Sequence, residues 1–190
     1  MAVASTPDAL TLEAGRRAFA RFGYHAATLE RIAEEAGVSR VTLHRRGVTK
    51  DAILQALAAE GTSRYRARLW PALTASGSAR DRLEMALGAL CEAAEDDMEL
   101  LLALRSQSDG VFHEDAPEDA LTRSVFTEPL ERLLRDGQAD GTLHAEVPEE
   151  TATVLFNLVG WTYIHLRTGH RWQPQRTREA VVRIALRGVV

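Results

Sequence analysis

The residues best suited to chemistry are cationic side chains that cluster near the end of the first quarter of this 190-residue chain. They are Arg40, Arg45, Arg46 and Lys50, with His44 among them. A guanidinium fork matches the edge of guanine and a phosphate group, and an ammonium is a compact partner for phosphate. The cluster therefore predicts a surface that contacts double-stranded DNA.

Two short helices joined by a tight turn are expected to present this cluster. Thr28 caps the first helix, and Gly37 ends it because glycine tolerates the left-handed conformation past a helix end. Ser39 then caps the second helix. The buried face of the first helix shows the i, i+3, i+4, i+7 spacing, with Leu29, Ile32, Ala33 and Ala36. A glycine-containing turn of about three residues between two helices is typical of a helix-turn-helix.

The second helix, residues 40–46, is too short and too basic to form part of a core. We expect Val38, Val41 and Leu43 to anchor it on the rest of the domain. Its polar side chains are then left for solvent or for a partner rich in hydrogen-bond acceptors. A short, exposed, cationic helix of this kind fits the major groove of DNA.

The expected roles divide these side chains into two groups. Arg40 and Arg45 are predicted to reach base edges, although any arginine in a groove can contact a phosphate instead. Lys50 opposes the dipole at the start of its own helix, and a phosphate there would reconcile its charge with the helix end. The full predicted DNA-binding set is Thr28, Ser39, Arg40, Val41, Thr42, His44, Arg45, Arg46 and Lys50, with Thr42, His44 and Arg46 on phosphates.

Four runs of residues in this region share a register with a known protein family. They are RFGYHAATL at 21–29, IAEEAGVS at 32–39, TL at 42–43 and KDAIL at 50–54. This register resembles the DNA-binding domain of TetR-family transcriptional regulators, and it covers the first quarter of the chain. The resemblance implies a palindromic operator, a homodimer, a small-molecule effector that releases the DNA, and a lysine at position 50 that grips the DNA backbone.

Two residues depart from the family pattern. The family usually has Tyr in place of His44 and an apolar residue such as Phe in place of Gly47. One ring that contacts phosphate and one packing residue are thereby altered. An alternative interpretation is therefore a helical ligand-binding or protein-binding dimer that has lost DNA binding.

The charge distribution agrees with DNA contact at one end of the chain. The net charge is −4, with 23 cations and 27 anions. Residues 1–50 carry eight of the cations and five of the anions, which gives +3, so the remainder carries −7. A basic segment on an acidic body is the electrostatic pattern of a DNA-binding domain, although an ordinary solvated charge pattern is the alternative.

Composition limits the class of protein. A hydrophobic content of 45% supports globular folding throughout. No apolar run approaches the roughly 18 to 20 residues that a membrane span needs, and the first ten residues lack the pattern of a secretion signal. The single cysteine, Cys91, excludes an internal disulfide and agrees with a reducing compartment. We therefore expect a cytoplasmic protein without membrane contact.

Helical periodicity continues to the end of the chain and predicts an all-α fold. A three-helix helix-turn-helix domain at 1–50 is expected to precede a helical ligand-binding and dimerisation domain at 51–190. Pro129 is expected to bend one helix of the second domain. The expected helices beyond the helix-turn-helix span 8–22, 50–73, 79–94, 96–108, 118–136, 148–166 and 177–188, with a linker at 74–78 and a turn at 137–143.

The last two expected helices are apolar on more than one face. A helix that is apolar all round must be covered on both sides, and Gly160 would allow close approach of a second copy. The alternative is that these helices complete the core of a monomer. The residues predicted for the dimer interface are Val154, Leu155, Leu158, Val159, Val181 and Ile184.

An enzyme is not expected. The six histidines include no pair at the spacing that places two metal ligands on one helix face, and no phosphate loop or nucleophile elbow is present. We predict no metal and no cofactor. An effector is instead expected among the helices between residues 80 and 166. The alternatives are that His165 is a hydrogen-bonded core or interface histidine, and that an acidic neighbour such as Glu99 or Asp109 pairs with Arg105. The predicted ligand set is Met98, Leu102, Arg105, Phe126, Trp161 and His165.

Overall fold

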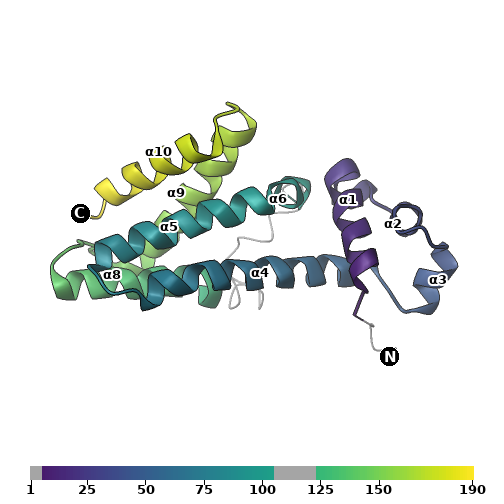
Figure 1. Cartoon of the computed structure of the whole chain (residues 1–190), viewed down its shortest axis with the longest axis horizontal. Helices are drawn as coiled ribbons and strands as arrows, with labels where there is room; N and C mark the ends of the chain where they lie inside the picture. Colours follow the sequence, from purple (N-terminus) through teal and green to yellow (C-terminus); the bar gives the residue numbers. More distant parts are fainter. Residues whose placement is uncertain (1–5, 105–122) are drawn as a thin grey trace. The chain divides into compact units, whose positions relative to one another are not determined.

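Every element is a helix in residues 6–104 and 123–190, the part of the chain that the computed structural model describes (Figure 1). Since these two ranges contain no strand, the expected all-α fold is confirmed. Arg105 and the start of the helix expected at residue 118 lie outside the described residues. The elements are α1 (Ala9–Ala26), α2 (Leu29–Glu35), α3 (Arg40–Arg45), α4 (Lys50–Thr74), α5 (Ala79–Asp96), α6 (Met98–Leu104), the π-helical turn η1 (Arg123–Thr127), α8 (Glu128–Asp140), α9 (Pro148–Thr168) and α10 (Pro174–Arg187).

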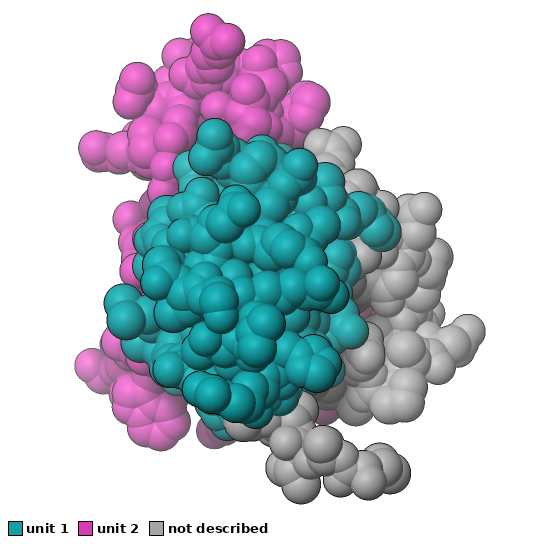
Figure 2. All heavy atoms as spheres, turned by 90° about the vertical axis from the view of Figure 1, so that its right-hand side faces the viewer, with its two compact units in different colours: residues 1–63, 97–112 teal, residues 64–96, 113–190 magenta. Residues whose placement is uncertain are grey.

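The described residues form two compact units, which Figure 2 colours separately. The first unit contains residues 6–63 and 97–104, and the second contains residues 64–96 and 123–190. Helix α4 supplies residues to both units. The division between the units therefore falls inside this helix, later than the domain boundary expected at residue 50.

One apolar core holds the first unit together. Phe19 of α1, Ile32 of α2, Leu43 of α3 and Ile53 of α4 are fully buried in it. Leu100 of α6 is 5% exposed and joins the same core, although it is distant in the sequence. The helix-turn-helix is therefore fixed by α1, α4 and α6 together.

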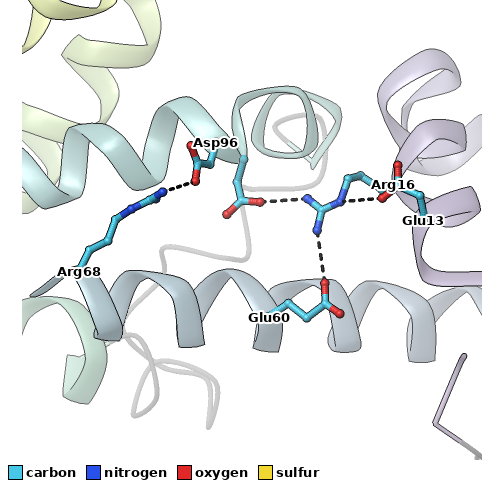
Figure 3. A network of polar contacts seen from close by, with 6 residues as sticks. Glu13, Arg16, Glu60, Arg68 and Asp96 are labelled. Atoms are coloured by element: carbon cyan, nitrogen blue, oxygen red, sulfur yellow. Dashed lines mark hydrogen bonds and ion pairs between the residues drawn. The ribbon is translucent and has the colours of Figure 1, made fainter. Parts of the chain in front are cut away.

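Ion pairs around Arg16 add to this packing (Figure 3). The Arg16 guanidinium lies 3.0 Å from the Asp97 carboxylate, which directly precedes α6, and 3.4 Å from the Glu60 carboxylate on α4. Glu13, one turn away on α1, lies 3.7 Å from it. Because the Asp97 side chain is only 13% exposed, this pair is less screened by water than an ordinary surface pair. The arginine thus connects α1, α4 and the start of α6.

The second unit packs α5, α8, α9 and α10 around leucine side chains such as Leu83, Leu87 and Leu133. Pro129 was expected to interrupt one helix from within. It lies instead in the first turn of α8, directly after η1, a position where proline is well tolerated. The helix also continues to Asp140, beyond the expected end at Asp136.

A partly buried polar network joins α5 to α9. Nε and Nη2 of Arg167 donate to the Glu95 carboxylate at 2.7 and 2.6 Å, and the Tyr163 hydroxyl donates to it at 2.8 Å. These hydrogen bonds stabilise the charged carboxylate, so the pKa of Glu95 lies below its usual range. The network fixes the C-terminal half of α9 against α5.

Cys91 is fully buried on α5, and burial raises the pKa of its thiol to about 12. It therefore stays protonated at neutral pH and serves as a core side chain.

No helix within the described ranges is long and apolar enough to cross a membrane. Those ranges also hold no group of three or more His, Cys, Asp or Glu side chains placed to bind a metal ion.

Candidate nucleic-acid interface

Helices α2 and α3 form the helix-turn-helix that the spacing predicted. The Thr28 hydroxyl accepts a hydrogen bond from the Arg31 backbone N–H at 3.3 Å and caps α2. The Ser39 hydroxyl accepts one from the Thr42 N–H at 3.1 Å and caps α3. Between them, Gly37 adopts φ +68°, the left-handed conformation that closes α2. Both capping side chains, Thr28 and Ser39, are exposed at the N-terminus of the helix that they cap.

Leu43 is the main anchor of α3. It is fully buried, and Val38 packs beside it at the edge of the same core. The expectation that Val41 also anchors the helix is wrong, because its side chain is 73% exposed. Successive helical residues differ by about 100°, so a residue two positions before Leu43 must face away from the core. Val41 is therefore available to a partner, as its place in the predicted DNA-binding set requires.

The arginines of α3 and of its C-terminal cap, Arg46, all reach the surface, but they differ in their partners. Arg40 lies 2.8 Å from the Glu30 carboxylate on α2, and Arg46 lies 2.7 Å from the carboxylate of Asp8. Arg45 is exposed and has no ion-pair partner within the described part of the chain. Exposed pairs of this kind contribute at most about 1 kcal/mol, so a nucleic acid can displace the carboxylates at small cost.

Lys50 begins α4, as expected, but its ammonium turns back onto the end of α1. It donates to the backbone carbonyls of Tyr24 at 2.9 Å and His25 at 3.4 Å, and lies 4.2 Å from the centre of the Tyr24 ring. The Tyr24 hydroxyl in turn donates to Asp51, and burial raises the pKa of Tyr24 to about 12. An ammonium has three N–H groups, so one donor is left for a phosphate. No spacing in the sequence indicated this contact.

The departure from the family pattern at Gly47 has a structural reason. Gly47 adopts φ +67°, and its N–H donates to the carbonyl of His44 at 2.9 Å. The N–H of Val48 then donates to the carbonyl of Leu43 at 3.1 Å, so the chain leaves α3 in a tight left-handed turn. Glycine adopts this conformation without strain, whereas a residue with a Cβ atom does not.

We expect Gly47→Ala to lower the free energy of unfolding of the chain by about 1–2 kcal/mol, the cost of the left-handed conformation for a residue with a side chain. Urea denaturation followed by circular dichroism measures the change. Gly188→Ala is the matched control, because Gly188 has φ −80° and a Cβ atom there would make only an ordinary contact. Equal stability of the two variants would contradict this role for Gly47.

The predicted ligand residues belong to different units. Met98 and Leu102 lie in the first unit, whereas Phe126, Trp161 and His165 lie in the second. Phe126 stacks on the Tyr65 ring, with centres 4.8 Å apart. His165 is exposed, and its ring lies 5.2 Å from that of His170.

The predicted dimer residues separate into an outer and an inner group. Val154, Leu158 and Ile184 are 61%, 43% and 62% exposed. The inner group is buried in the core of the second unit, with exposures of 5% or less, and consists of Leu155, Val159 and Val181. Because these three side chains are already buried within one chain, we remove them from the expected interface.

A helix-turn-helix whose second helix is exposed and cationic is typical of DNA-binding proteins. Residues 12–57 match the family described as bacterial regulatory proteins, tetR family, and residues 76–189 match the tetracyclin repressor-like C-terminal domain. These matches cover most of the chain, which therefore belongs to the TetR family of bacterial transcriptional regulators. The resemblance seen in the sequence is confirmed. Members of this family are non-enzymatic DNA-binding proteins, so the chain is a regulator and not an enzyme.

Solved structures share this fold over nearly their whole length. The TetR-family regulator PfmR from Thermus thermophilus is 19% identical with a TM-score of 0.76, and the match covers 95% of this chain and 98% of that chain. The regulator FadR from Bacillus subtilis, in complex with stearoyl-CoA, is 16% identical with a TM-score of 0.74 and the same coverage. A tetR-family protein from Rhodococcus RHA1 is 23% identical with a TM-score of 0.77, covering 94% of each chain. No curated protein sequence matches significantly.

Proposed function

We propose that this protein is a transcriptional repressor that binds a palindromic operator as a homodimer and is released by a small-molecule effector. Residues 1–50 provide the DNA contacts, and residues 51–190 provide effector binding and dimerisation. Since its target is DNA, we propose that the protein acts in the cytoplasm. No cofactor or metal takes part in this function.

The observation that carries the proposal is the exposed cationic face of α3, held on the first unit by a buried Leu43. Arg40 and Arg45 are its candidates for base contact, and Thr42, His44 and Arg46 for phosphate contact. The N-terminus of a helix offers free backbone N–H groups to an anion. Helices α2 and α3 each have such an end, next to their caps Thr28 and Ser39. The exposed Val41 side chain and the single ammonium donor left on Lys50 complete the proposed set.

Dimerisation is supported by the outer apolar face of the second unit. Val154 and Leu158 lie one turn apart on α9, and Ile184 lies on α10, which packs against α9. Exposed apolar patches of this kind commonly mark protein interfaces. A two-fold contact through this face would present two copies of α3 to half-sites about 34–36 Å apart, or a multiple of that spacing.

Release by an effector is proposed as a change in which of two conformations the dimer occupies. A ligand that binds one conformation more tightly lowers operator affinity by its differential affinity for the two states. Binding of stearoyl-CoA by the FadR structure supports a small-molecule site in this fold. We place the site in the second unit, where Phe126, Trp161 and His165 are the candidate residues from the predicted set.

Operator binding is tested by a mobility shift with the DNA upstream of the protein's own gene. We expect a shifted complex at nanomolar protein that survives an excess of unrelated duplex, because specific binding is typically at least about 10³-fold tighter than non-specific binding. Complete competition by the unrelated duplex would favour the alternative, a helical ligand-binding or protein-binding dimer that has lost DNA binding.

A further inference from the structure

Two buried hydrogen-bond donors on α4 have no acceptor among the residues that the structure describes. They are the hydroxyl of Tyr65, a residue that is 1% exposed, and Nη1 of Arg68. Native proteins satisfy the large majority of buried polar side-chain atoms, so each exception calls for an explanation. Residues three positions apart lie on the same face of a helix. The two donors are therefore neighbours on one face of α4, within the second unit.

Only part of the hydrogen-bonding capacity of the Arg68 guanidinium is satisfied within the described residues. Its Nη2 lies 2.5 Å from the Asp96 carboxylate on α5, and Figure 3 shows the side chain extending from α4 towards this residue. Its charge is thus paired, whereas the buried Nη1 has no hydrogen bond to any described residue. A guanidinium has five donors and matches a second carboxylate well.

Two further aromatic rings, Phe126 and Phe156, pack in series beside Tyr65. The Tyr65 ring stacks on Phe126 at 4.8 Å between centres, and Phe126 lies 5.1 Å from Phe156 on α9. Burial raises the pKa of Tyr65, so its hydroxyl stays protonated and can donate at neutral pH. Apolar and aromatic walls with a few placed polar groups are typical of sites for small molecules.

The element that carries Phe126 is itself unusual. Phe126 belongs to η1, a π-helical turn of five residues that directly precedes α8. π-Helical turns are rare and occur frequently at functional sites. Tyr65 thus joins two features of the second unit, the unsatisfied donors on α4 and the aromatic rings that include the π-helical turn's Phe126.

We infer that Tyr65 and Arg68 form the polar end of the effector site, and that the effector is an organic acid with an apolar body. Its carboxylate accepts hydrogen bonds from the Tyr65 hydroxyl and from Nη1 of Arg68. Its apolar part lies against Phe126 and Phe156. This inference rests on the proposed function, which assigns a small-molecule effector to the second unit.

The ligand-free protein provides the first test. We expect Tyr65→Phe to raise the melting temperature by about 2–4 °C, because it removes an unsatisfied buried hydroxyl and keeps the stacked ring. Differential scanning calorimetry of the full chain measures this shift. A lower melting temperature would show that the hydroxyl has a partner inside the folded protein, and it would overturn the inference.

Binding of defined probes provides the second test. Benzoate, 3-phenylpropanoate and decanoate are titrated calorimetrically into the full chain, each beside the alcohol of the same carbon skeleton. We expect at least one acid to bind more tightly than its alcohol and to lose about tenfold or more in affinity in Tyr65→Phe and in Arg68→Gln, since hydrogen bonds to a charged group are among the strongest. Arg80→Gln is the control, because Arg80 also lies near acidic side chains but is partly exposed on α5.

The outcomes separate this inference from the proposed function when operator binding is measured in parallel. The acid that binds should release the operator from the wild-type chain, and release from Tyr65→Phe should need about tenfold or more of the same acid. Absence of binding by all three acids at millimolar concentration, or equal binding to wild type and Tyr65→Phe, overturns the inference alone if the wild type still binds its operator. A wild type that binds no operator refutes the proposed function instead.

Discussion

Replacing Arg40 and Arg45 together by alanine should weaken operator binding about 30-fold to 10⁴-fold, at about 1–3 kcal/mol for each good base contact. Both side chains are exposed on α3, and Arg45 has no ion-pair partner among the described residues. Arg40 must leave Glu30, 2.8 Å away, to reach DNA, but an exposed pair of this kind opposes that step by at most about 1 kcal/mol. Fluorescence anisotropy with a labelled operator duplex measures the loss.

Two controls make this result specific. Arg135→Ala removes an arginine that is 62% exposed on α8 and pairs with Glu131, and it should leave operator affinity unchanged. Arg46→Ala should weaken binding to all sequences alike and reduce the slope of affinity against salt concentration by about one phosphate contact. Unchanged operator affinity in the Arg40 and Arg45 double variant would contradict the assignment of α3 as the reading helix.

Placing charge on the outer face of α9 and α10 should abolish dimerisation. Leu158→Glu with Ile184→Glu buries no charge within one chain, because the two side chains are 43% and 62% exposed. A two-fold interface would contain both changes from each chain, so four carboxylates would lie in one apolar contact and the dimer should dissociate. Loss of the linked second helix-turn-helix should then lower operator affinity by about 10²-fold to 10⁴-fold. Analytical ultracentrifugation and operator titration measure the two effects.

Met85→Glu is the matched control for exposure. Met85 is 43% exposed, as is Leu158, but it lies on α5 outside the proposed face. This variant should remain dimeric and should bind the operator normally. A double variant that stays dimeric, with unchanged circular dichroism, would place the interface elsewhere on the chain.

The helix-turn-helix was largely predictable from the sequence because its signals are local. Thr28, Gly37 and Ser39 act within one or two turns of their own positions, and each occupies the predicted cap or turn. The contacts that the sequence did not indicate are those between elements. The pairing of Arg40 with Glu30 depends on how α3 packs on α2, and that of Lys50 with the Tyr24 carbonyl on how α4 packs on α1.

The second unit was predictable as a set of helices but less so in its surfaces. Periodicity located α9 and α10, yet a helix that is apolar on several sides does not show which side the protein covers itself. Leu155 and Val159 were therefore assigned to the interface, although they lie in the core. Tyr65 and Arg68 were missed for a related reason, since an unsatisfied donor is visible only when its surroundings are known.

The central claim is that two copies of this chain bind one palindromic operator through paired copies of α3. Sedimentation equilibrium of the full chain with a labelled duplex from upstream of its own gene measures the composition of the complex directly. We predict two chains on each palindromic site, with no significant population of one-chain complexes. A complex with one chain, or no specific complex at any concentration that resolves specific from non-specific binding, would contradict the claim.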